Sequence, residues 1–235
     1  MPGIDKINQQ KEDQPKSSGF SNRTELIMNQ PGDVAVVAVV SDGSDSEDDR
    51  LSSYARHSYQ DDDGRWIYAF CKGTVDKLCS MCEEGRPVQN RFAFWAYVYA
   101  LQRKVAQQGD SWRQETKGKE TVWTLDINDF RMVTLPFGRQ DTFWKQFTDV
   151  YYEHGAMNKV ALRITRDGSG RETSWRIATT PKTINWDELP SNDNLPSVKD
   201  HFLEIEAQRQ QAIEAVSLSD SNDDDESGLD VESLF

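Results

Sequence analysis

The stretch 57-HSYQDDDGRWIYAFCKGTVDKLCSMC-82 contains all three cysteines of the chain and one of its three histidines. Its spacing is His-x13-Cys-x7-Cys-x2-Cys. A structural zinc site takes four tetrahedral ligands, and three thiolates with one imidazole are a common set. The sequence therefore predicts one structural Zn²⁺ bound by His57, Cys71, Cys79 and Cys82.

A hairpin would bring His57 next to the cysteines. The run Asp61-Asp62-Asp63-Gly64 predicts a turn, and residues 66–70 have the composition of the returning strand. An aspartate of 61–63 is an alternative fourth ligand, and a reduced or redox-active cysteine trio is an alternative to metal binding. His154 and His201 lie outside this unit.

Composition limits the class of protein. A chain of 235 residues fits one medium domain with tails, or two small domains. An odd number of cysteines and the lack of a recognisable signal peptide indicate a reducing compartment. No apolar run approaches the ~20 residues that span a bilayer, so we expect a cytoplasmic location and no membrane partner.

Charge is distributed unevenly along the chain, whose net charge is −13. Residues 91–186 hold 15 basic and 10 acidic side chains, whereas residues 187–235 hold 2 basic and 14 acidic ones. This asymmetry favours a nucleic-acid-binding core with an acidic interaction tail. The alternative is a solvated tail that serves only solubility.

The periodicity predicts a mainly β protein. Strand patterns cover residues 34–40, 65–70, 91–103, 121–137, 159–166 and 172–179. A helix is predicted over 140–153, with Gly155 as its C-terminal cap. Residues 106–120 lack a pattern and predict a mobile loop. This inventory is typical of a Greek-key barrel with insertions.

The segment 91-RFAFWAYVYALQRK-104 alternates between two kinds of side chain. One face carries aromatic and basic residues, namely Arg91, Trp95, Tyr97, Tyr99 and Arg103. The other face carries uncharged apolar residues, namely Phe92, Phe94, Val98 and Ala100. We expect the second face to be buried and the first to be available for stacked bases. Burial of both faces is the alternative.

Composition shifts near both ends of the chain. Residues 1–31 predict a flexible arm, and 184–196 predict a linker. Residues 197–216 predict an amphipathic helix, with Ser197 and Asp200 forming a capping box. Residues 217–235 predict a disordered acidic tail that ends in Leu234-Phe235.

Several motifs resemble those of a known family. They are His57-Ser-Tyr, Gly64-Arg-Trp66, the cysteines Cys71 and Cys79-x2-Cys82, and Phe94-Trp95-Ala96. In this order they are similar to the zinc-containing single-stranded DNA-binding (helix-destabilising) proteins of T-even-type phages. The resemblance covers about residues 33–180, and its most specific part is the order of the metal ligands.

The resemblance implies an OB-fold DNA-binding core over 32–183 with an inserted zinc-ribbon-like subdomain at about 54–90. It further implies sequence-independent coating and protection of single-stranded DNA in phage replication, recombination and repair. The expected location is the cytoplasm of an infected bacterial host. Expected partners are single-stranded DNA and replication or recombination proteins recruited by the tail, with weak self-association on DNA.

The nucleic-acid contacts are expected from aromatic rings that stack on bases and from arginines that meet phosphates. They are Trp66, Phe94, Trp95, Tyr97, Tyr99, Arg91, Arg103, Arg131, Arg139, Arg163, Arg166, Arg171 and Arg176. Partner contacts are expected from the acidic and apolar residues of the tail. These are Asp223, Asp224, Asp225, Glu226, Asp230, Glu232, Leu234 and Phe235.

Two other functions fit parts of the sequence. One is a zinc-ribbon transcription or assembly adaptor that binds proteins rather than DNA. The other is a metal-dependent nuclease that uses the acidic runs 45–49 and 61–63. The sequence has no recognisable Ser/His/Asp set and no glycine-rich phosphate loop, so we expect no enzymatic activity.

Overall fold

The computed structural model describes residues 24–45, 48–60, 64, 66–75, 77–107, 111–118, 120–137 and 142–220. The side chains of 117, 142, 171, 209, 210 and 212–220 are not described. Three sets of predicted residues therefore lie outside the described part: the turn aspartates 61–63, Arg139 with the Arg171 side chain, and the tail residues 223–235.

The protein is mainly β, as predicted, with one antiparallel sheet of eight strands in the order β3-β2-β4-β1-β7-β8, while β6 pairs with β4 and β5. The strands are β1 (Val34–Val39), β2 (Leu51–Gln60), β3 (Trp66–Phe70), β4 (Val88–Arg103), β5 (Arg113–Lys117), β6 (Glu120–Pro136), β7 (Val160–Asp167) and β8 (Ser174–Thr183). The α-helices are α2 (Ser80–Glu83), α3 (Thr142–His154) and α4 (Val198–Asp220). Short 3-10 turns are η1 (Lys72–Val75), η2 (Met157–Lys159), η3 (Gly170–Glu172) and η4 (Trp186–Glu188).

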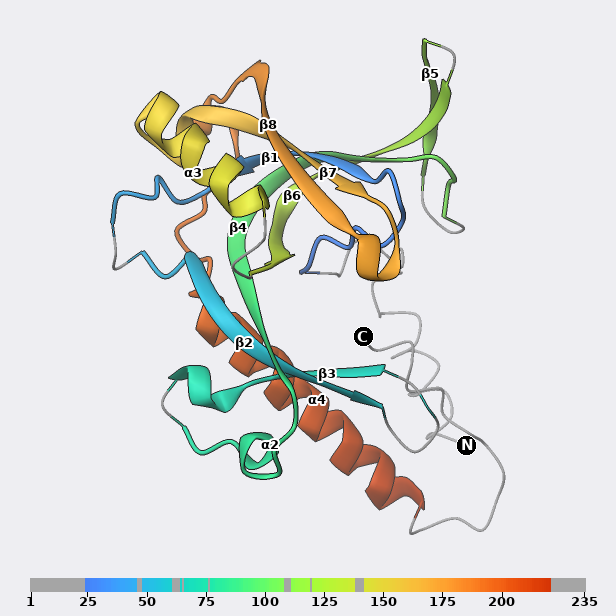
Figure 1. The fold of residues 1–235 in the computed structure, drawn as a ribbon, viewed down its shortest axis with the longest axis vertical. Coiled ribbons are helices and arrows are strands. Elements are labelled where there is room, and N and C mark those ends of the chain that lie inside the picture. Colours follow the sequence, from blue (N-terminus) through green and yellow to red (C-terminus); the bar gives the residue numbers. More distant parts are fainter. Residues whose placement is uncertain are drawn as a thin grey trace, which may run out of the picture.

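Strand β4 connects two lobes (Figure 1). Its C-terminal half pairs with β1, its N-terminal half pairs with β2, and β6 runs along its other edge. We call β1, β5 to β8 and α3 the upper lobe, and β2, β3, η1 and α2 the lower lobe. Each lobe is therefore built on one end of the same strand.

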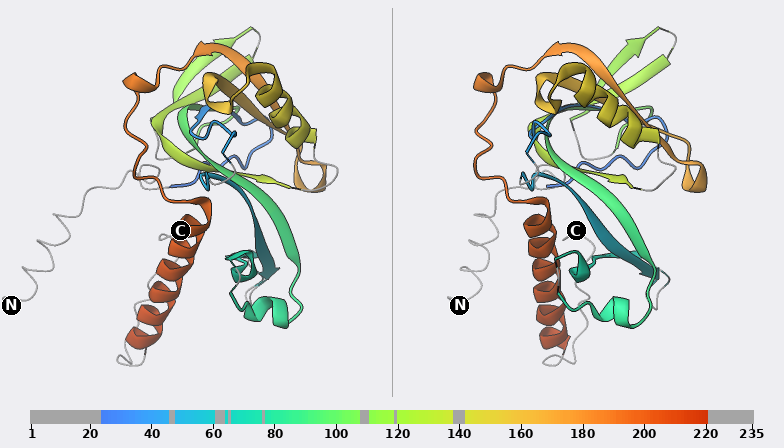
Figure 2. Two further views of the ribbon diagram at one scale, coloured as in Figure 1. Left: turned by 90° about the vertical axis from the view of Figure 1, so that its left-hand side faces the viewer. Right: turned by 60° about the vertical axis from the view of Figure 1, so that its left-hand side comes forward.

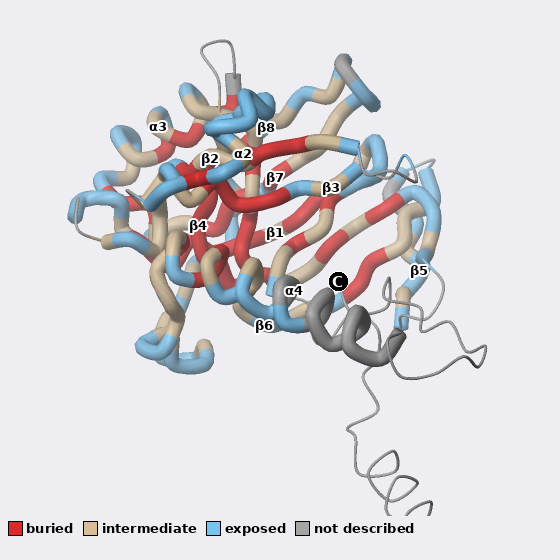
Figure 3. The backbone as a smooth tube through the Cα atoms, turned by 90° about the horizontal axis from the view of Figure 1, so that it is seen from below, coloured by how far each residue is buried: buried red, intermediate tan, exposed pale blue. Residues whose placement is uncertain are grey.

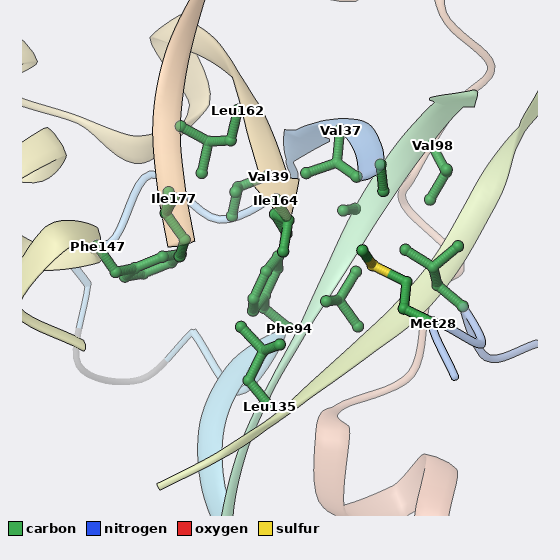
Figure 4. Packing of buried hydrophobic residues seen from close by; sticks show 14 of the residues in the cluster. Met28, Val37, Val39, Phe94, Val98, Leu135, Phe147, Leu162, Ile164 and Ile177 are labelled. Atoms are coloured by element: carbon green, nitrogen blue, oxygen red, sulfur yellow. The ribbon is translucent and has the colours of Figure 1, made fainter. Parts of the chain in front are cut away.

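The alternation predicted for β4 generates two apolar cores. Phe92, Phe94 and Val98 belong to the core of the upper lobe, whereas Ala93 and Trp95 belong to a second cluster on the opposite face. Figure 4 shows the first core closing around Phe94 from the β1, β7 and β8 sides. Both faces of β4 are buried along most of its length, as the tube in Figure 3 shows.

Helix α3 confirms the predicted helix over 140–153 within two residues. Phe143, Phe147 and Val150 are buried in the upper core. Gly155 adopts φ 73°, and its N–H donates to the Tyr151 carbonyl oxygen at 2.7 Å. This left-handed conformation ends the helix, which is the role predicted for a glycine at that position.

Helix α4 runs beside the lower lobe (Figure 2). Half of the predicted capping box is observed: the Asp200 N–H donates to Ser197 Oγ at 3.0 Å, whereas the Asp200 carboxylate accepts from the Ser197 hydroxyl at 2.8 Å rather than from its backbone N–H. Val198 and Phe202 are buried in the second core. The helix continues to Asp220, so the predicted end at residue 216 is wrong.

Two predicted irregular segments are ordered parts of the fold. The predicted arm 1–31 is wrong for residues 24–31, because Leu26 and Met28 are buried and Leu26 bridges to Met132 of β6 through an N–H···O bond of 2.9 Å. The predicted loop 106–120 contains β5, which pairs with β6. A strand made of polar residues has no apolar alternation, so the sequence gives no signal for it.

Candidate functional site

The structure brings the four predicted metal ligands together in the lower lobe. One ligand atom from each of His57, Cys71, Cys79 and Cys82 lies within 4.8 Å of all the others. The Cys71 Sγ atom lies 4.0 Å from Cys79 Sγ and 3.5 Å from Cys82 Sγ. The His57 Nε2 atom lies 3.3 Å from Cys79 Sγ and 3.5 Å from Cys82 Sγ. All four atoms thus face one common centre.

A hydrogen bond at Nδ1, the ring nitrogen that faces away from the sulfurs, fixes the orientation of His57. Its Nδ1 lies 3.2 Å from the Pro87 carbonyl oxygen, which accepts a hydrogen bond from the Nδ1–H tautomer. Nε2 then keeps its lone pair and points toward the sulfurs. Such an outer hydrogen bond is typical of metal-binding histidines, because it sets the tautomer and the ring angle. The pairing of His57 with Ala69 in the β2–β3 hairpin places His57 beside the strand end that leads to Cys71.

The acid–base chemistry of the thiols also suits a cation. Burial raises the pKa of Cys79, but hydrogen bonds from the Cys82 backbone and from His57 lower it to about 6. The hydrogen bond with Cys71 raises the pKa of Cys82 to about 12. Cys79 therefore loses its proton readily, whereas the neighbouring cysteines disfavour a second thiolate at Cys82. A divalent metal ion at the centre would remove this conflict by stabilising all three cysteines as thiolates.

The opposite face of the same hairpin carries aromatic side chains. Because strand residues alternate, His57 and Cys71 point to the metal side, whereas Arg56, Trp66 and Tyr68 point away from it. Trp66 is 59% exposed and Tyr68 is 51% exposed. The Arg56 guanidinium carbon lies 4.2 Å from the centre of the Tyr68 ring, a cation–π contact.

These side chains form one wall of a groove of roughly 380 Å³ between β3 and α4, which we call the aromatic groove. Its floor contains Tyr54 and Phe202, whose ring centres are 4.2 Å apart. Glu25 and Glu206 of α4 also line it. The groove is therefore mostly apolar and rich in aromatic rings, with two carboxylates in its lining.

Three predicted base-stacking residues, Phe94, Trp95 and Tyr97, are buried, and those predictions are wrong for this structure. Phe94 has no exposed surface in the upper core, where the alternation of β4 places it with Phe92. Trp95 is covered by the α4 segment: its Nε1–H donates to the Pro196 carbonyl at 2.8 Å, and its ring meets His201 edge-on. The segment that covers Trp95 is about a hundred residues away in sequence.

Tyr97 and Tyr99 lie farther along β4, and Tyr99 is the more exposed of the two. Tyr97 is buried and Tyr99 is half-buried, and Tyr97 makes edge-to-face contacts with Tyr99 and Phe130. The Lys182 Nζ atom lies 3.4 Å from the Tyr99 ring centre. A single base could stack here only after Lys182 moves.

The predicted arginines divide into buried and exposed groups. Arg103 is buried and pairs with buried Asp33 at 3.1 Å, so its prediction as a phosphate contact is wrong. Arg131 is also buried and pairs with Asp129 at 3.1 Å, while half-buried Arg91 donates to the Thr134 carbonyl.

Three predicted arginines belong to the β7–β8 hairpin. Arg163 and Arg176 are exposed and Arg166 is half-buried. Arg176 pairs with Asp167 at 2.5 Å. Arg56 and Tyr68 were not among the predicted contacts. Tyr68 lies two residues from Trp66 on β3, and Arg56 of β2 pairs with Phe70, so the alternation of the strands places all three side chains on the same face of the hairpin.

Helix α4 contains a histidine whose charge is linked to folding. Burial lowers the pKa of His201 to about 4, and its Nε2 is buried with no hydrogen-bond partner among the described residues. The unfolded chain has a histidine pKa near 6.5. Because only the unfolded state binds the proton between about pH 6.5 and 4, stability is retained above this window and falls within it, by up to about 3 kcal/mol.

We therefore expect His201→Leu to lose less stability than the parent protein on acidification. Urea unfolding at about pH 7 and about pH 4.5 measures the difference. Carboxylates titrate in both proteins, so the comparison isolates the histidine. Equal losses in the two proteins would contradict a buried neutral His201.

The fold and the site define a mainly β protein with a Cys/His cluster whose ligand atoms are close enough to hold a metal ion. Comparison with protein-family models finds no match, and neither does a search of curated proteins. Within the described part of the chain, the helices are too short or too polar to cross a membrane.

Proposed function

We propose that the Cys/His cluster holds one structural Zn²⁺. Zn–S bonds of about 2.3 Å and Zn–N bonds of about 2.0 Å in a tetrahedron separate the ligand atoms by about 3.5–3.8 Å. The measured separations among the ligand atoms of His57, Cys71, Cys79 and Cys82 are 3.3–4.0 Å, which supports this ion. When bound, the ion would tie the hairpin to the α2 turn. Four protein ligands leave no open position for a substrate.

The upper lobe supports an OB-like fold. Its elements follow the order β1, β4, β6, α3, β7 and β8, with β1 paired to both β4 and β7. Five strands with this pairing correspond to a partly open Greek-key barrel. Among the described residues β8 pairs with β7 alone, so the barrel is open at that edge. The lower lobe is then the insertion between the first two barrel strands, a connection that OB-folds use for ligands.

The function that this arrangement supports best is sequence-tolerant binding of single-stranded DNA. The observation that carries the proposal is the pair of exposed rings, Trp66 and Tyr68, two residues apart on one face of β3. Large exposed aromatics in a groove offer stacking surfaces to unpaired bases, at about 1–3 kcal/mol per base. Bases in a duplex are already stacked, so a duplex should bind more weakly.

Phosphates would meet the cations on the open side of the groove. Arg56 lines the groove, and Figure 1 shows the turn between β7 and β8 on the same side of the molecule as the end of β3. Arg166 and Arg176 lie on the two strands that flank this turn. If about five phosphates are neutralised, the logarithm of affinity should fall with the logarithm of salt at a slope near −3.5. Recruitment of replication proteins by the acidic tail remains a proposal from its composition alone.

The test is a titration with a labelled single-stranded oligonucleotide and its matched duplex. Trp66→Ala should weaken single-strand binding about tenfold or more, because it removes one stacked base. Tyr152→Ala is the matched control, since Tyr152 is 80% exposed on α3 away from the groove. We expect that control to bind like the parent protein.

Two outcomes would overturn the proposal. Equal affinity for duplex and single strand would show that stacking on free bases is not involved. Failure to bind either nucleic acid would favour a zinc-containing adaptor that binds proteins.

A further inference from the structure

The aromatic groove carries negative charge as well as aromatic rings. Glu25 and Glu206 both line it and both are half-buried. Among the described residues neither carboxylate accepts a hydrogen bond or forms a close ion pair, although the charges of Arg56 and Arg91 act on Glu25. Arg56 is the basic residue of the lining, and its guanidinium lies over Tyr68.

Two carboxylates disfavour a phosphate inside the groove. Like charges in a partly desolvated space repel strongly, so the sugar–phosphate backbone must stay outside. The same carboxylates are acceptors without donors, so a group that enters must bring N–H bonds. A neutral flat ring with an amino group at its edge satisfies both the aromatic walls and the acceptors.

We propose that the aromatic groove selects bases with an exocyclic amino group, so the protein prefers cytosine-containing single strands over uracil- or thymine-containing ones. The inference rests on the proposed single-strand binding and adds a base preference to it. The base would stack on Trp66 and present its amino edge to Glu206 or Glu25. Carboxylates accept from the cytosine N4 amino group.

A comparison of cytosine with uracil separates hydrogen bonding at the edge of the base from stacking and from backbone charge. Cytosine offers an amino donor where uracil offers a carbonyl acceptor, which a carboxylate repels. The two rings have the same size, and neither carries the methyl group of thymine. Stacking and backbone charge are therefore closely matched, and the difference in affinity reports the edge of the base.

Glu206 is the better position for substitution. Burial raises the pKa of Glu25, although Arg56 and Arg91 oppose the rise, and Glu25 adjoins the Met132 bridge of the fold. Glu206 lies on the face of α4 that lines the groove. Its neighbour Glu204 is exposed on the same helix and bonds to Gln208, so Glu204→Gln changes the charge equally outside the groove.

The experiment measures the affinities of oligo-dC and oligo-dU of about eight nucleotides by fluorescence anisotropy. We expect the full chain to bind oligo-dC about fivefold more tightly, as one carboxylate–amine contact would give. Glu206→Gln should reduce the ratio to below about twofold, because an amide can also donate to the uracil carbonyl. Glu204→Gln should keep the parent ratio.

The outcomes distinguish this inference from the function on which it rests. Tight binding of both oligonucleotides with equal affinity would overturn the base preference and leave single-strand binding intact. A dC preference that survives in Glu206→Gln would place the selection elsewhere and overturn the role of the groove. Binding of neither oligonucleotide, with binding of an arginine-rich peptide, would assign the groove to a basic protein segment and overturn both.

Discussion

Replacing Cys79 with serine should lower the free energy of unfolding of the lower lobe by about 5 kcal/mol or more, because structural zinc contributes on the order of 10 kcal/mol in small zinc domains. Apart from the metal site, few buried contacts stabilise η1 and α2 at the outer end of the lower lobe. The second apolar core lies near β4 and α4, whereas the η1 and α2 turns have no fully buried residue. Without the metal, the hairpin would keep its pairing with β4 and the stacking of Tyr54 and Phe70 on Phe202, but η1 and α2 would have no buried side chain of their own to anchor them.

The measurement is urea unfolding followed by hydrogen exchange of the β2 and β3 amides, with zinc content determined in parallel. We expect one zinc per parent chain and less than one in Cys79→Ser. Leu78→Ser is the matched control, because Leu78 is 88% exposed beside the ligand and its loss should cost less than about 0.5 kcal/mol. Full stability in a zinc-free Cys79→Ser protein would contradict a structural metal site.

Removing the Arg103 side chain should destabilise the protein by about 3–5 kcal/mol, since it leaves the buried Asp33 carboxylate without its charge partner. Both side chains are almost fully buried, at 2% and 0% exposure. Arg103 also donates to the Ile27 carbonyl at 2.7 Å, so it fastens the segment before β1 to β4. Loss of the guanidinium therefore breaks an ion pair and a segment contact together.

Arg103→Ala and Arg113→Ala make a matched comparison by thermal or urea unfolding. Arg113 pairs with Asp126 at 3.0 Å, but both are more than half exposed, so its loss should cost less than about 1 kcal/mol. The double variant Arg103→Met with Asp33→Asn should recover part of the stability, because no charge remains buried. Similar small losses for both arginines would contradict the role assigned to the buried pair.

The sequence was most informative where local chemistry decides the structure. The spacing of the four metal ligands requires a hairpin and a tight turn, and the described structure contains both. The alternation in β4 separates two faces correctly. Phe94 shows the value of that rule: its parity assigned it to the buried face, and only the family resemblance assigned it to DNA.

Long-range packing explains the errors. Trp95 occupies the predicted aromatic face of β4, but the chain before α4 returns to cover it. Leu26 and Met28 lie in a polar segment whose apolar residues are too few to predict a core contact, yet β6 provides a hydrogen-bonding edge. Arg103 reaches a carboxylate seventy residues earlier. Such contacts depend on tertiary topology, which local patterns do not encode.

The two faces of the β2–β3 hairpin explain why the metal ligands and the proposed DNA contacts are neighbours in sequence. His57 follows Arg56, and Cys71 follows Phe70, so each strand places a metal-side residue next to a groove-side residue. A change at the metal should therefore alter the position of Trp66 and Tyr68. This coupling is a consequence of the strand period and needs no conformational switch.

The most direct test of the central proposal is to locate bound DNA on the protein. Ultraviolet cross-linking to a cytosine-containing single strand, followed by trypsin digestion and mass spectrometry, identifies the attached peptide. We predict that the major cross-link falls in peptide 66–72, which contains Trp66 and Tyr68, and that it disappears with excess unlabelled single strand but not with duplex. Cross-links confined to other parts of the chain, or insensitive to the competitor, would contradict binding at the aromatic groove.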